Sequence, residues 1–336
     1  MCERSKTLAV LAQRGRCLTT IWKRSFGPII RAILSFALVA ALAYHIGSGE
    51  IIGDIRSISW EAFAASTLLL TTSVFIVTLR WTAILSVLGY RLAWTNLVGS
   101  VFIGFLFNQL LPTIVGGDVF RALRAKQLGT PLETAVHSVL LDRATGVLVS
   151  LIFAAILLPF VEFRDGRTNL EWFLVGVAAL AVLGVLVLWA LTRQFEFSRP
   201  TLAGLHKRLI RLHQSIWAFT KLPVKSAVVF VLATLNQFLP VTVTAIFASD
   251  LAIQVGIKDI ALIVFIASIA TMIPISIAGW GVREGVLVFL FGLKGVSPQS
   301  AFTVSILFGA AQALSSAPGV LLLLKGGNLK PAEPLT

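Results

Sequence analysis

Charged residues are scarce in this chain of 336 residues: they make up 13% of it, whereas hydrophobic residues make up 57%. Soluble domains contain about 25% charged and about 45–50% apolar residues. A protein of this size has too little interior to hide such an apolar excess from water. The composition therefore excludes an ordinary soluble protein. It excludes a disordered chain even more firmly, because disordered chains are poor in apolar residues.

Cysteine is also rare, and the familiar catalytic motifs are missing. Cys2 and Cys17, the two cysteines, have neither metal-ligand spacing nor the pattern of a disulfide framework. The sequence lacks a P-loop lysine, an HExxH helix, a G-x-S-x-G elbow and a cysteine–histidine arrangement. We therefore expect no catalytic residue, no metal site and no cofactor, and we favour a protein that is not an enzyme.

What the chain has in abundance is apolar blocks, each close to the length of about 20 residues that crosses a bilayer as a helix. The short alternating segments of a membrane β-barrel are absent. The pattern predicts an all-α polytopic membrane protein. The blocks lie at 28–47, 61–79, 95–111, 133–160, 171–192, 225–249, 259–278, 281–293 and 299–324.

The net charge of +13 is concentrated in two places. Half of the Lys and Arg residues lie in the N-terminal tail through Arg31 and in the stretch 193–225. Basic residues collect on the cytoplasmic side of membrane proteins, so the charge indicates orientation and no nucleic-acid partner. The connections 48–61, 161–171 and 249–259 are neutral or acidic, which predicts that they lie outside and that both termini are cytoplasmic.

Two segments cannot be single crossings under this orientation. Block 61–79 returns to the cytoplasm and leaves Arg80 there, so residues 95–132 begin and end inside. Residues 259–298 begin and end outside by the same reasoning. Each is predicted to be a re-entrant hairpin, which gives six full spans plus two hairpins, or eight spans by simple counting. The alternative for the first segment is two full crossings, and the charges of 113–129 argue against it.

The order span, span, hairpin, span fills residues 28–160 and recurs in opposite orientation over 171–324. The sequence therefore predicts an inverted repeat. The remaining parts are a basic cytoplasmic tail at 1–27, an outer loop at 161–170, the basic cytoplasmic loop 193–225 inside the second repeat, and a cytoplasmic tail at 325–336.

The predicted hairpin tips share the pattern P-x4-G-x3-R. Pro112, Gly117 and Arg121 match Pro274, Gly279 and Arg283. Broken elements at matching positions of an inverted repeat point to a transporter site near the repeat axis. Non-helical backbone at membrane depth survives only where protein or a cavity surrounds it. The predicted breaks are Pro112, Gly116, Gly117, Pro274, Gly279 and Gly281.

A few charged residues lie within or beside the apolar blocks, where each would cost about 2.5–3.5 kcal/mol if it faced lipid at a helix centre. We expect them to face one another, a wet cavity or a polar ligand. Arg121 and Arg283 are the first candidates for phosphate contact, because guanidinium groups bind phosphate in a bidentate manner. The full candidate set for a lipid headgroup is Asn108, Asp118, Arg121, Asp142, Arg143, Arg283 and Glu284.

Structural alternatives stay open for these residues. Asp118–Arg121 and Arg283–Glu284 could be ion pairs that only hold the hairpins, and Asp142–Arg143 could be a structural pair. Two near-identical stretches, Asn-Gln-Leu-Leu-Pro at 108–112 and Asn-Gln-Phe-Leu-Pro at 236–240, do not fall at equivalent positions of the repeat. The sequence gives no explanation for the likeness of the two stretches.

The basic loop contains an amphipathic pattern, which predicts a helix lying on anionic lipid at the cytoplasmic surface. Its apolar positions are Leu205, Leu209, Leu212, Ile216 and Trp217.

Three stretches together, 108–124, 138–146 and 274–285, resemble the transmembrane domain family of lysylphosphatidylglycerol synthase/flippase. The resemblance covers roughly 25–325. It implies a bacterial or archaeal inner-membrane protein linked to polar lipids, with lipid-pathway enzymes as conceivable partners. In the full-length synthases a soluble C-terminal domain makes the aminoacyl lipid. This sequence stops at Thr336 without such a domain, so we do not expect synthase activity.

The function predicted from residues and resemblance together is a flippase-like protein. It would bind a phosphate-containing polar lipid, such as a phospholipid, polyprenyl lipid or glycolipid, and translocate it between leaflets. The alternatives are a membrane-embedded transferase and an accessory subunit of a lipid or glycolipid pathway. The sequence does not indicate the lipid, the energy source or the oligomeric state.

Overall fold

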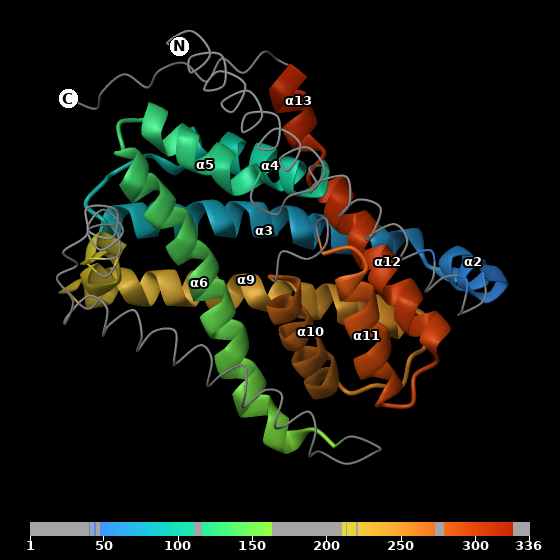
Figure 1. Cartoon of the computed structure of the whole chain (residues 1–336). Helices are drawn as coiled ribbons and strands as arrows, with labels where there is room; N and C mark the ends of the chain where they lie inside the picture. Colours follow the sequence, from blue (N-terminus) through green and yellow to red (C-terminus); the bar gives the residue numbers. More distant parts are fainter. Residues whose placement is uncertain are drawn as a thin grey trace, which may run out of the picture.

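The computed structural model describes residues 48–110, 116–162, 210–272 without 213 and 220, and 279–324, together with the single residues 40 and 44. Those parts are helical and contain no strand (Figure 1). Several predictions lie outside the described residues: the spans 28–47 and 171–192, the outer loop 161–170 beyond Glu162, most of the basic loop, both tails, and the breaks Pro112 and Pro274.

Four helices in the described part of the chain are long and apolar enough to cross a membrane. They coincide with the predicted spans at 61–79, 133–160, 225–249 and 299–324. The elements are α3 (Trp60–Val87), α6 (Leu132–Leu157) with the 3-10 turn η1 (Leu158–Phe160), α9 (Pro223–Asp250), and α12 (Pro298–Ser315) with α13 (Pro318–Leu324).

Shorter helices fill the segments that the orientation argument singled out. They are α4 (Trp94–Leu110), α5 (Gly116–Gln127), α10 (Ile257–Thr271) and α11 (Val282–Gly292); a further short helix, α2 (Ser48–Ser57), precedes α3. At about 1.5 Å per residue, helices as short as α5 and α11 are well below the roughly 30 Å of a hydrocarbon core. α4 packs against α5, and α10 packs against α11.

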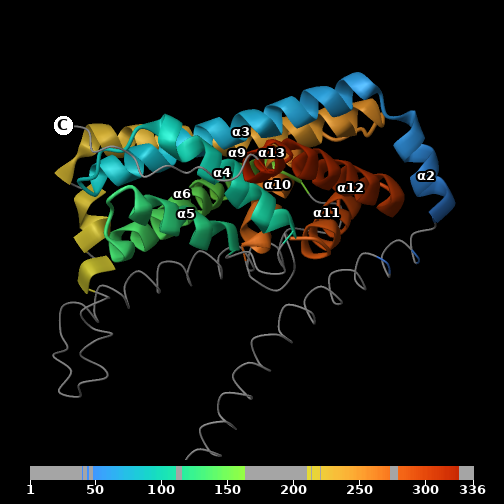
Figure 2. The same cartoon turned by 90° about the horizontal axis from the view of Figure 1, so that it is seen from above.

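The long helices α3 and α9 run side by side for most of their length (Figures 1 and 2). Polar contacts join them at both ends. The carboxylate of Asp250, the last residue of α9, accepts from the backbone N–H of Ser59 at 2.7 Å. Ser59 is the N-cap of α3. At the opposite end the Lys225 ammonium donates to the carbonyl of Ser86 at 3.2 Å. Asp250 lies at the N-terminus of α3 and Lys225 near its C-terminus, so both charges complement the dipole of α3.

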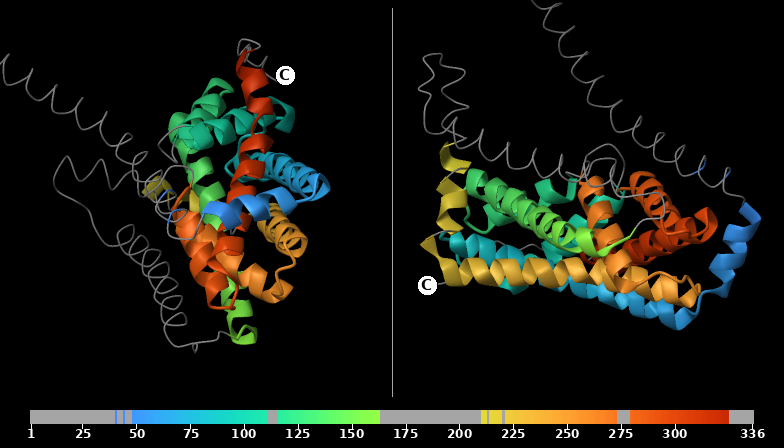
Figure 3. Two further views of the ribbon diagram at one scale, coloured as in Figure 1. Left: turned by 90° about the vertical axis from the view of Figure 1, so that its right-hand side faces the viewer. Right: turned by 90° about the horizontal axis from the view of Figure 1, so that it is seen from below.

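Each pair of short helices has its own apolar core. Around α4 and α5 the buried cluster includes Trp81, Leu97 and Ala125, with α3 and α6 contributing. Around α10 and α11 a second cluster includes Phe265 and Phe291, with α6, α9 and α12 contributing. Figure 3 shows α3 and α9 extending along each other from a further side. The long helices thus form a common support for two separately packed short-helix pairs.

The predicted break glycines are required for different structural reasons. Gly279 and Gly281 have φ of 81° and 88°, the left-handed region that favours glycine, in the turn before α11. Gly116 and Gly117 form the start of α5. A Cβ on Gly117 would lie 2.0 Å from the carbonyl oxygen of Gly104 on α4. Gly117 is therefore required by the close crossing of α4 and α5, where no side chain fits.

Candidate functional site

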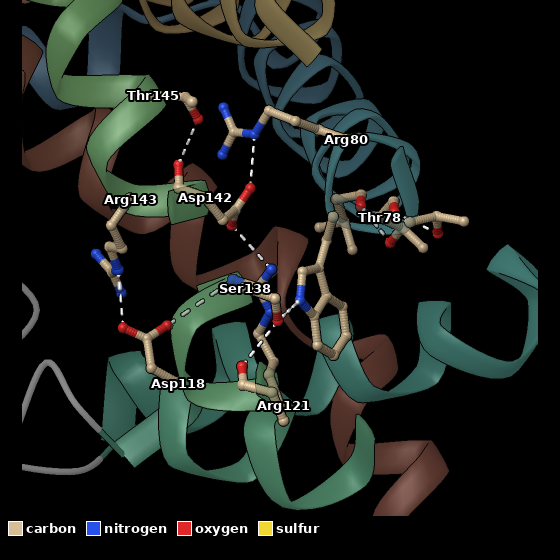
Figure 4. A network of polar contacts seen from close by, with 12 residues as sticks. Thr78, Arg80, Asp118, Arg121, Ser138, Asp142, Arg143 and Thr145 are labelled. Atoms are coloured by element: carbon tan, nitrogen blue, oxygen red, sulfur yellow. Dashed lines mark hydrogen bonds and ion pairs between the residues drawn. The ribbon is translucent and has the colours of Figure 1, made fainter. Parts of the chain in front are cut away.

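Asp142 lies at the centre of a buried ionic cluster and is only 2% exposed. Its Oδ1 accepts from Arg80 Nε at 2.6 Å, and its Oδ2 accepts from Arg121 Nη2 at 2.8 Å. α6 supplies the carboxylate, whereas α3 and α5 supply the two arginines (Figure 4). One carboxylate therefore joins three helices in the membrane region.

Arg143, which follows Asp142 on α6, adds a further ion pair to the cluster. Arg143 Nε donates to Asp118 Oδ2 on α5 at 2.8 Å. The same carboxylate lies 3.8 Å from Arg121 through Oδ1. Figure 4 shows the resulting chain of contacts from Arg80 through Asp142 and Arg121 to Asp118 and Arg143. Neighbouring side chains of α6 thus hold both charged residues near the start of α5.

The structural pairs considered from the sequence are only partly right in this half. Asp142 and Arg143 do not form a pair with each other, because each reaches a different charged residue on α5. Asp118 and Arg121 do lie within ion-pair distance. Each nevertheless has a closer charged partner on α6, since i,i+3 neighbours on α5 project toward different side chains of that helix.

The sequence put the end of the second predicted span at residue 79, but α3 continues through Val87, and Arg80 is buried inside the protein at 5% exposure. The signal was present, because the seven residues after Arg80 are mostly apolar and extend the helix by about two turns. Arg80 is therefore a fourth arginine of the site.

Arg283 and Glu284 form a second buried cluster at the start of α11. Arg283 Nη2 donates to Glu284 Oε1 at 2.6 Å, so this pair, considered from the sequence, is confirmed. Glu284 also accepts from the backbone N–H of Gly281, which caps the helix. Ser305 on α12 donates to Glu284 at 3.1 Å, and Arg283 donates to Gln312 on α12 at 3.3 Å. Glu284 is completely buried.

The two arginines that the tip pattern matched have similar surroundings. Arg121 lies over the ring of Trp81 at 4.5 Å and contacts Asp142. Arg283 lies over the ring of Trp280 at 4.9 Å and contacts Glu284. A carboxylate and an indole face each guanidinium, which keeps its planar group in a fixed orientation.

Two cavities of about 280 Å³ and 220 Å³ connect these clusters. The larger one reaches Arg283, and the smaller one reaches Arg80, Arg121 and Asp142. Part of the lining belongs to both, so the cavities adjoin. The shared residues are Phe105, Arg143, Asn236, Gln237, Ser268 and Gln312.

The two Asn-Gln stretches whose likeness the sequence left unexplained both line the smaller cavity. Asn108 and Gln109 line the smaller cavity, while Asn236 and Gln237 line both. Asn108 also accepts from the N–H of Gly117 at 3.1 Å. These amides lie together only because α4 and α9 pack around the same cavity. Their positions in the predicted repeat do not indicate this proximity.

The described lining carries more arginines than carboxylates. Arg80, Arg121, Arg143 and Arg283 line the cavities, and among the described residues the single lining carboxylate is Asp142. Asp118 and Glu284 lie behind, each paired with a lining arginine. Four arginines against these three carboxylates leave one positive charge in excess. The two cavities are therefore lined with one positive charge that has no counter-ion among the described residues.

The chain matches a known protein family over most of its length. The family described as the lysylphosphatidylglycerol synthase TM region matches residues 29–319, which is most of the chain. This protein belongs to that family. The match includes the predicted span at 28–47, apart from its first residue, and the predicted span at 171–192. The resemblance inferred from the three stretches is thereby confirmed.

Two archaeal relatives of this family member are similar along most of their length. A UPF0104 membrane protein of Methanothermobacter thermautotrophicus is 25% identical over 307 residues, covering 82% of this chain and 87% of the relative. A UPF0104 membrane protein of Methanocaldococcus jannaschii is 20% identical over 298 residues, covering 83% and 88%. The family member is a multi-pass integral membrane protein, consistent with a lipid-related function.

Proposed function

We propose that this protein binds a phosphate-containing polar lipid by its headgroup and moves it between the two leaflets. The observation that carries the proposal is the excess positive charge of the adjoining cavities. Burying an unpaired charge is expensive, and a phosphodiester brings one negative charge. A lipid supplies that phosphate inside the membrane, while its tails remain in the bilayer.

Two arginine nitrogens beside Asp142 have unused hydrogen-bonding capacity. Arg80 Nη1 and Arg121 Nε are buried and have no hydrogen-bond partner within the described structure. Both guanidinium groups are held by Asp142 through their other nitrogens. A phosphate oxygen would reach the unused nitrogens after a shift of the surrounding side chains, because these atoms are buried. The contacts with Asp142 hold the two guanidinium groups in place, which reduces the cost of ordering them on binding.

The proposed path uses the two short-helix pairs as re-entrant hairpins of an inverted repeat. The shortness of α5 and α11 supports this, as does the packing of each against the preceding helix. The similar carboxylate–arginine–tryptophan sets around Arg121 and Arg283 support it as well. Headgroup binding between two hairpins that enter from opposite faces would let either leaflet reach the cavities.

The proposal includes the orientation and location predicted from charge: both termini in the cytoplasm of a bacterial or archaeal cell, with the chain in its cytoplasmic membrane. In the described part of the basic loop, Ile216 and Trp217 are 40% and 48% exposed. Exposed apolar side chains on a basic helix are typical of contact with an anionic lipid surface.

The test is a scrambling assay with the purified full chain in liposomes that contain labelled phospholipids and polyprenyl phosphates. We expect the protein to accelerate the exchange of at least one labelled phosphate lipid between leaflets. Arg121→Ala should reduce that rate at least ten-fold, whereas Arg91→Ala, which removes an exposed arginine, should not.

Folding of each variant is checked by its thermal unfolding in detergent. If the folded wild-type protein moves none of these lipids, translocation is wrong and an accessory or transferase role becomes the better explanation. If Arg121→Ala folds and transports normally, the assignment of phosphate binding to these arginines is wrong.

A further inference from the structure

The adjoining cavities differ chemically, and the difference concerns the part of the headgroup beyond the phosphate. The smaller cavity contains the excess of arginines around Asp142. In the larger cavity, Arg283 is neutralised by Glu284, and the rest of the polar lining is uncharged apart from the shared Arg143. A ligand that fills both cavities therefore meets positive charge at one end and mostly neutral polar groups at the other.

Three carboxamides lie where the cavities adjoin, and neighbouring contacts fix each of them. Asn236 Oδ1 accepts from the hydroxyl of Ser73 at 2.7 Å. Gln237 donates to the hydroxyl of Ser150 and to the carbonyl of Gly146, and Gln312 accepts from Arg283 at 3.3 Å. A carboxamide offers two donors and an oxygen with two acceptor positions. These contacts leave the oxygen of Gln237 and the amide nitrogens of Asn236 and Gln312 for a ligand. All three residues line both cavities.

A hydroxyl group both donates and accepts, which a carboxamide can satisfy in both directions. An ammonium group only donates and needs a carboxylate when it is removed from water. Within the described lining the one carboxylate, Asp142, is already bound by two arginines. The described lining therefore has groups for neutral hydroxyls, and its one carboxylate is already paired.

We infer that the headgroup recognised here is a phosphodiester whose far end is uncharged and rich in hydroxyl groups, such as a polyol or a sugar, in preference to an amine-bearing headgroup. This inference rests on the proposed function and adds the chemical class of the substrate. Phosphate occupies the arginine-rich cavity, and the hydroxyl-bearing part contacts Asn236, Gln237 and Gln312 in the adjoining one.

The test compares three lipids with the same tails and the same phosphodiester. Phosphatidylinositol carries hydroxyls, phosphatidylmethanol carries none, and lysyl-phosphatidylglycerol carries two ammonium groups. In liposomes with the wild-type full chain, we expect phosphatidylinositol to exchange at least ten-fold faster than either of the others. Equal rates for phosphatidylinositol and phosphatidylmethanol, or a faster rate for lysyl-phosphatidylglycerol, would overturn the inference and leave the proposed function standing.

A variant adds a change of preference that mere loss of folding cannot imitate. Asn236→Asp is nearly isosteric and places a carboxylate at the boundary of the cavities. It should raise the rate for lysyl-phosphatidylglycerol relative to phosphatidylinositol at least ten-fold, while Thr72→Ala, on the exposed side of α3, should leave the ratio unchanged. An unchanged ratio in folded Asn236→Asp contradicts the role of the carboxamides.

Binding separates failure of the inference from failure of translocation. The same three lipids are added to the protein in detergent, and the shift of its unfolding temperature is measured, since a ligand that binds the folded state stabilises it. A larger shift with phosphatidylinositol supports the headgroup class even if no lipid moves. Equal shifts with all three lipids overturn it.

Discussion

At the scale of the residue, the site depends on charged side chains whose burial costs much free energy singly and far less when they form ion pairs. Asp142 is buried between Arg80 and Arg121, and each guanidinium uses one of the two carboxylate oxygens. A buried ion pair contributes little net stability compared with apolar residues, but removal of one partner leaves an uncompensated charge in a medium of low dielectric. The carboxylate therefore matters most as the counter-ion of two arginines.

Replacement of that carboxylate gives the first prediction. Asp142→Asn should destabilise the protein by about 3–5 kcal/mol, because two buried arginines lose their counter-ion. The readout is thermal or denaturant unfolding in detergent. Glu61→Gln, which removes an exposed carboxylate, is the control and should change little. Adding Arg80→Met to Asp142→Asn should recover part of the loss; no recovery would mean that charge imbalance is not the cause.

A glycine supplies the second prediction at this scale. A Cβ on Gly309 would lie 2.4 Å from Arg283 Nη2 and 2.7 Å from the ring of Trp280. Gly309→Ala should therefore displace Arg283 and lower lipid exchange several-fold, with altered tryptophan fluorescence as a second readout. The matched control is Gly285→Ala on α11, where a Cβ meets nothing within 4 Å.

The control has an expected sign of its own. Alanine is favoured over glycine in a helix by roughly 1 kcal/mol, so Gly285→Ala should be neutral or stabilising. Equal behaviour of the two variants would show that the space beside Arg283 is not limiting.

At the scale of the element, the pairing of α3 and α9 sets the frame in which the site is built. Their ends are joined by Asp250 at the N-terminus of α3 and by Lys225 near its C-terminus. Such contacts fix the register of two long apolar helices, which otherwise can slide along each other with little penalty in lipid. The register matters because Ser73 and Arg80 of α3 must meet Asn236 and Asp142 on different helices.

Loss of the cap at the first of these ends gives the third prediction. The hydroxyl of Ser59 accepts from the N–H of Ala62 and donates to Asp250. Ser59→Ala should cost about 0.5–2 kcal/mol, as removal of an N-cap usually does. Thr72→Ala in the same helix is the control, since the hydroxyl of Thr72 only bonds back to Leu68 within α3. The measurement is unfolding in detergent, and equal losses would contradict a specific cap.

At the scale of the whole molecule, four long helices and two pairs of short ones form one membrane body in the described part of the chain. The short pairs have separate apolar cores on α3, α6 and α9, and the polar cavities lie where those long helices face both pairs. This arrangement buries Arg80, Arg121, Asp142, Arg283 and Glu284 inside the protein, whereas a charge that faced lipid at a helix centre would cost about 2.5–3.5 kcal/mol.

The fourth prediction concerns the path of the short pairs through the membrane. In a chain with Cys2 and Cys17 replaced by serine, single cysteines are placed at exposed positions on either side of each pair. Arg91→Cys and Lys126→Cys should both react with an impermeant reagent from the cytoplasmic side. Lys258→Cys and Pro298→Cys should both react from the outside. Labelling of Lys126→Cys from the outside alone would show that the first pair makes one net crossing and is not a re-entrant hairpin.

Composition, block length and charge asymmetry by themselves determined that this chain is a helical multi-pass membrane protein, because they reflect the solvent in which each segment is stable. The charge-derived orientation also set apart the two segments, 95–132 and 259–298, that contain the four short helices, and the tip pattern singled out Arg121 and Arg283. The three motif stretches led to the family.

Only the tertiary structure decided how the charges combine. Contacts between side chains far apart in sequence depend on which helix faces meet, and a linear pattern does not contain that information. Arg80 therefore looked like the end of a span, and the likeness of the two Asn-Gln stretches had no explanation until the structure placed both on the lining of the same cavity. Asp142 and Arg143 looked like a pair because they are adjacent, as Arg283 and Glu284 are, but only Arg283 and Glu284 bind each other. In the packed structure Asp142 contacts Arg121 and Arg143 contacts Asp118. The one positive charge in excess lies beside the two cavities.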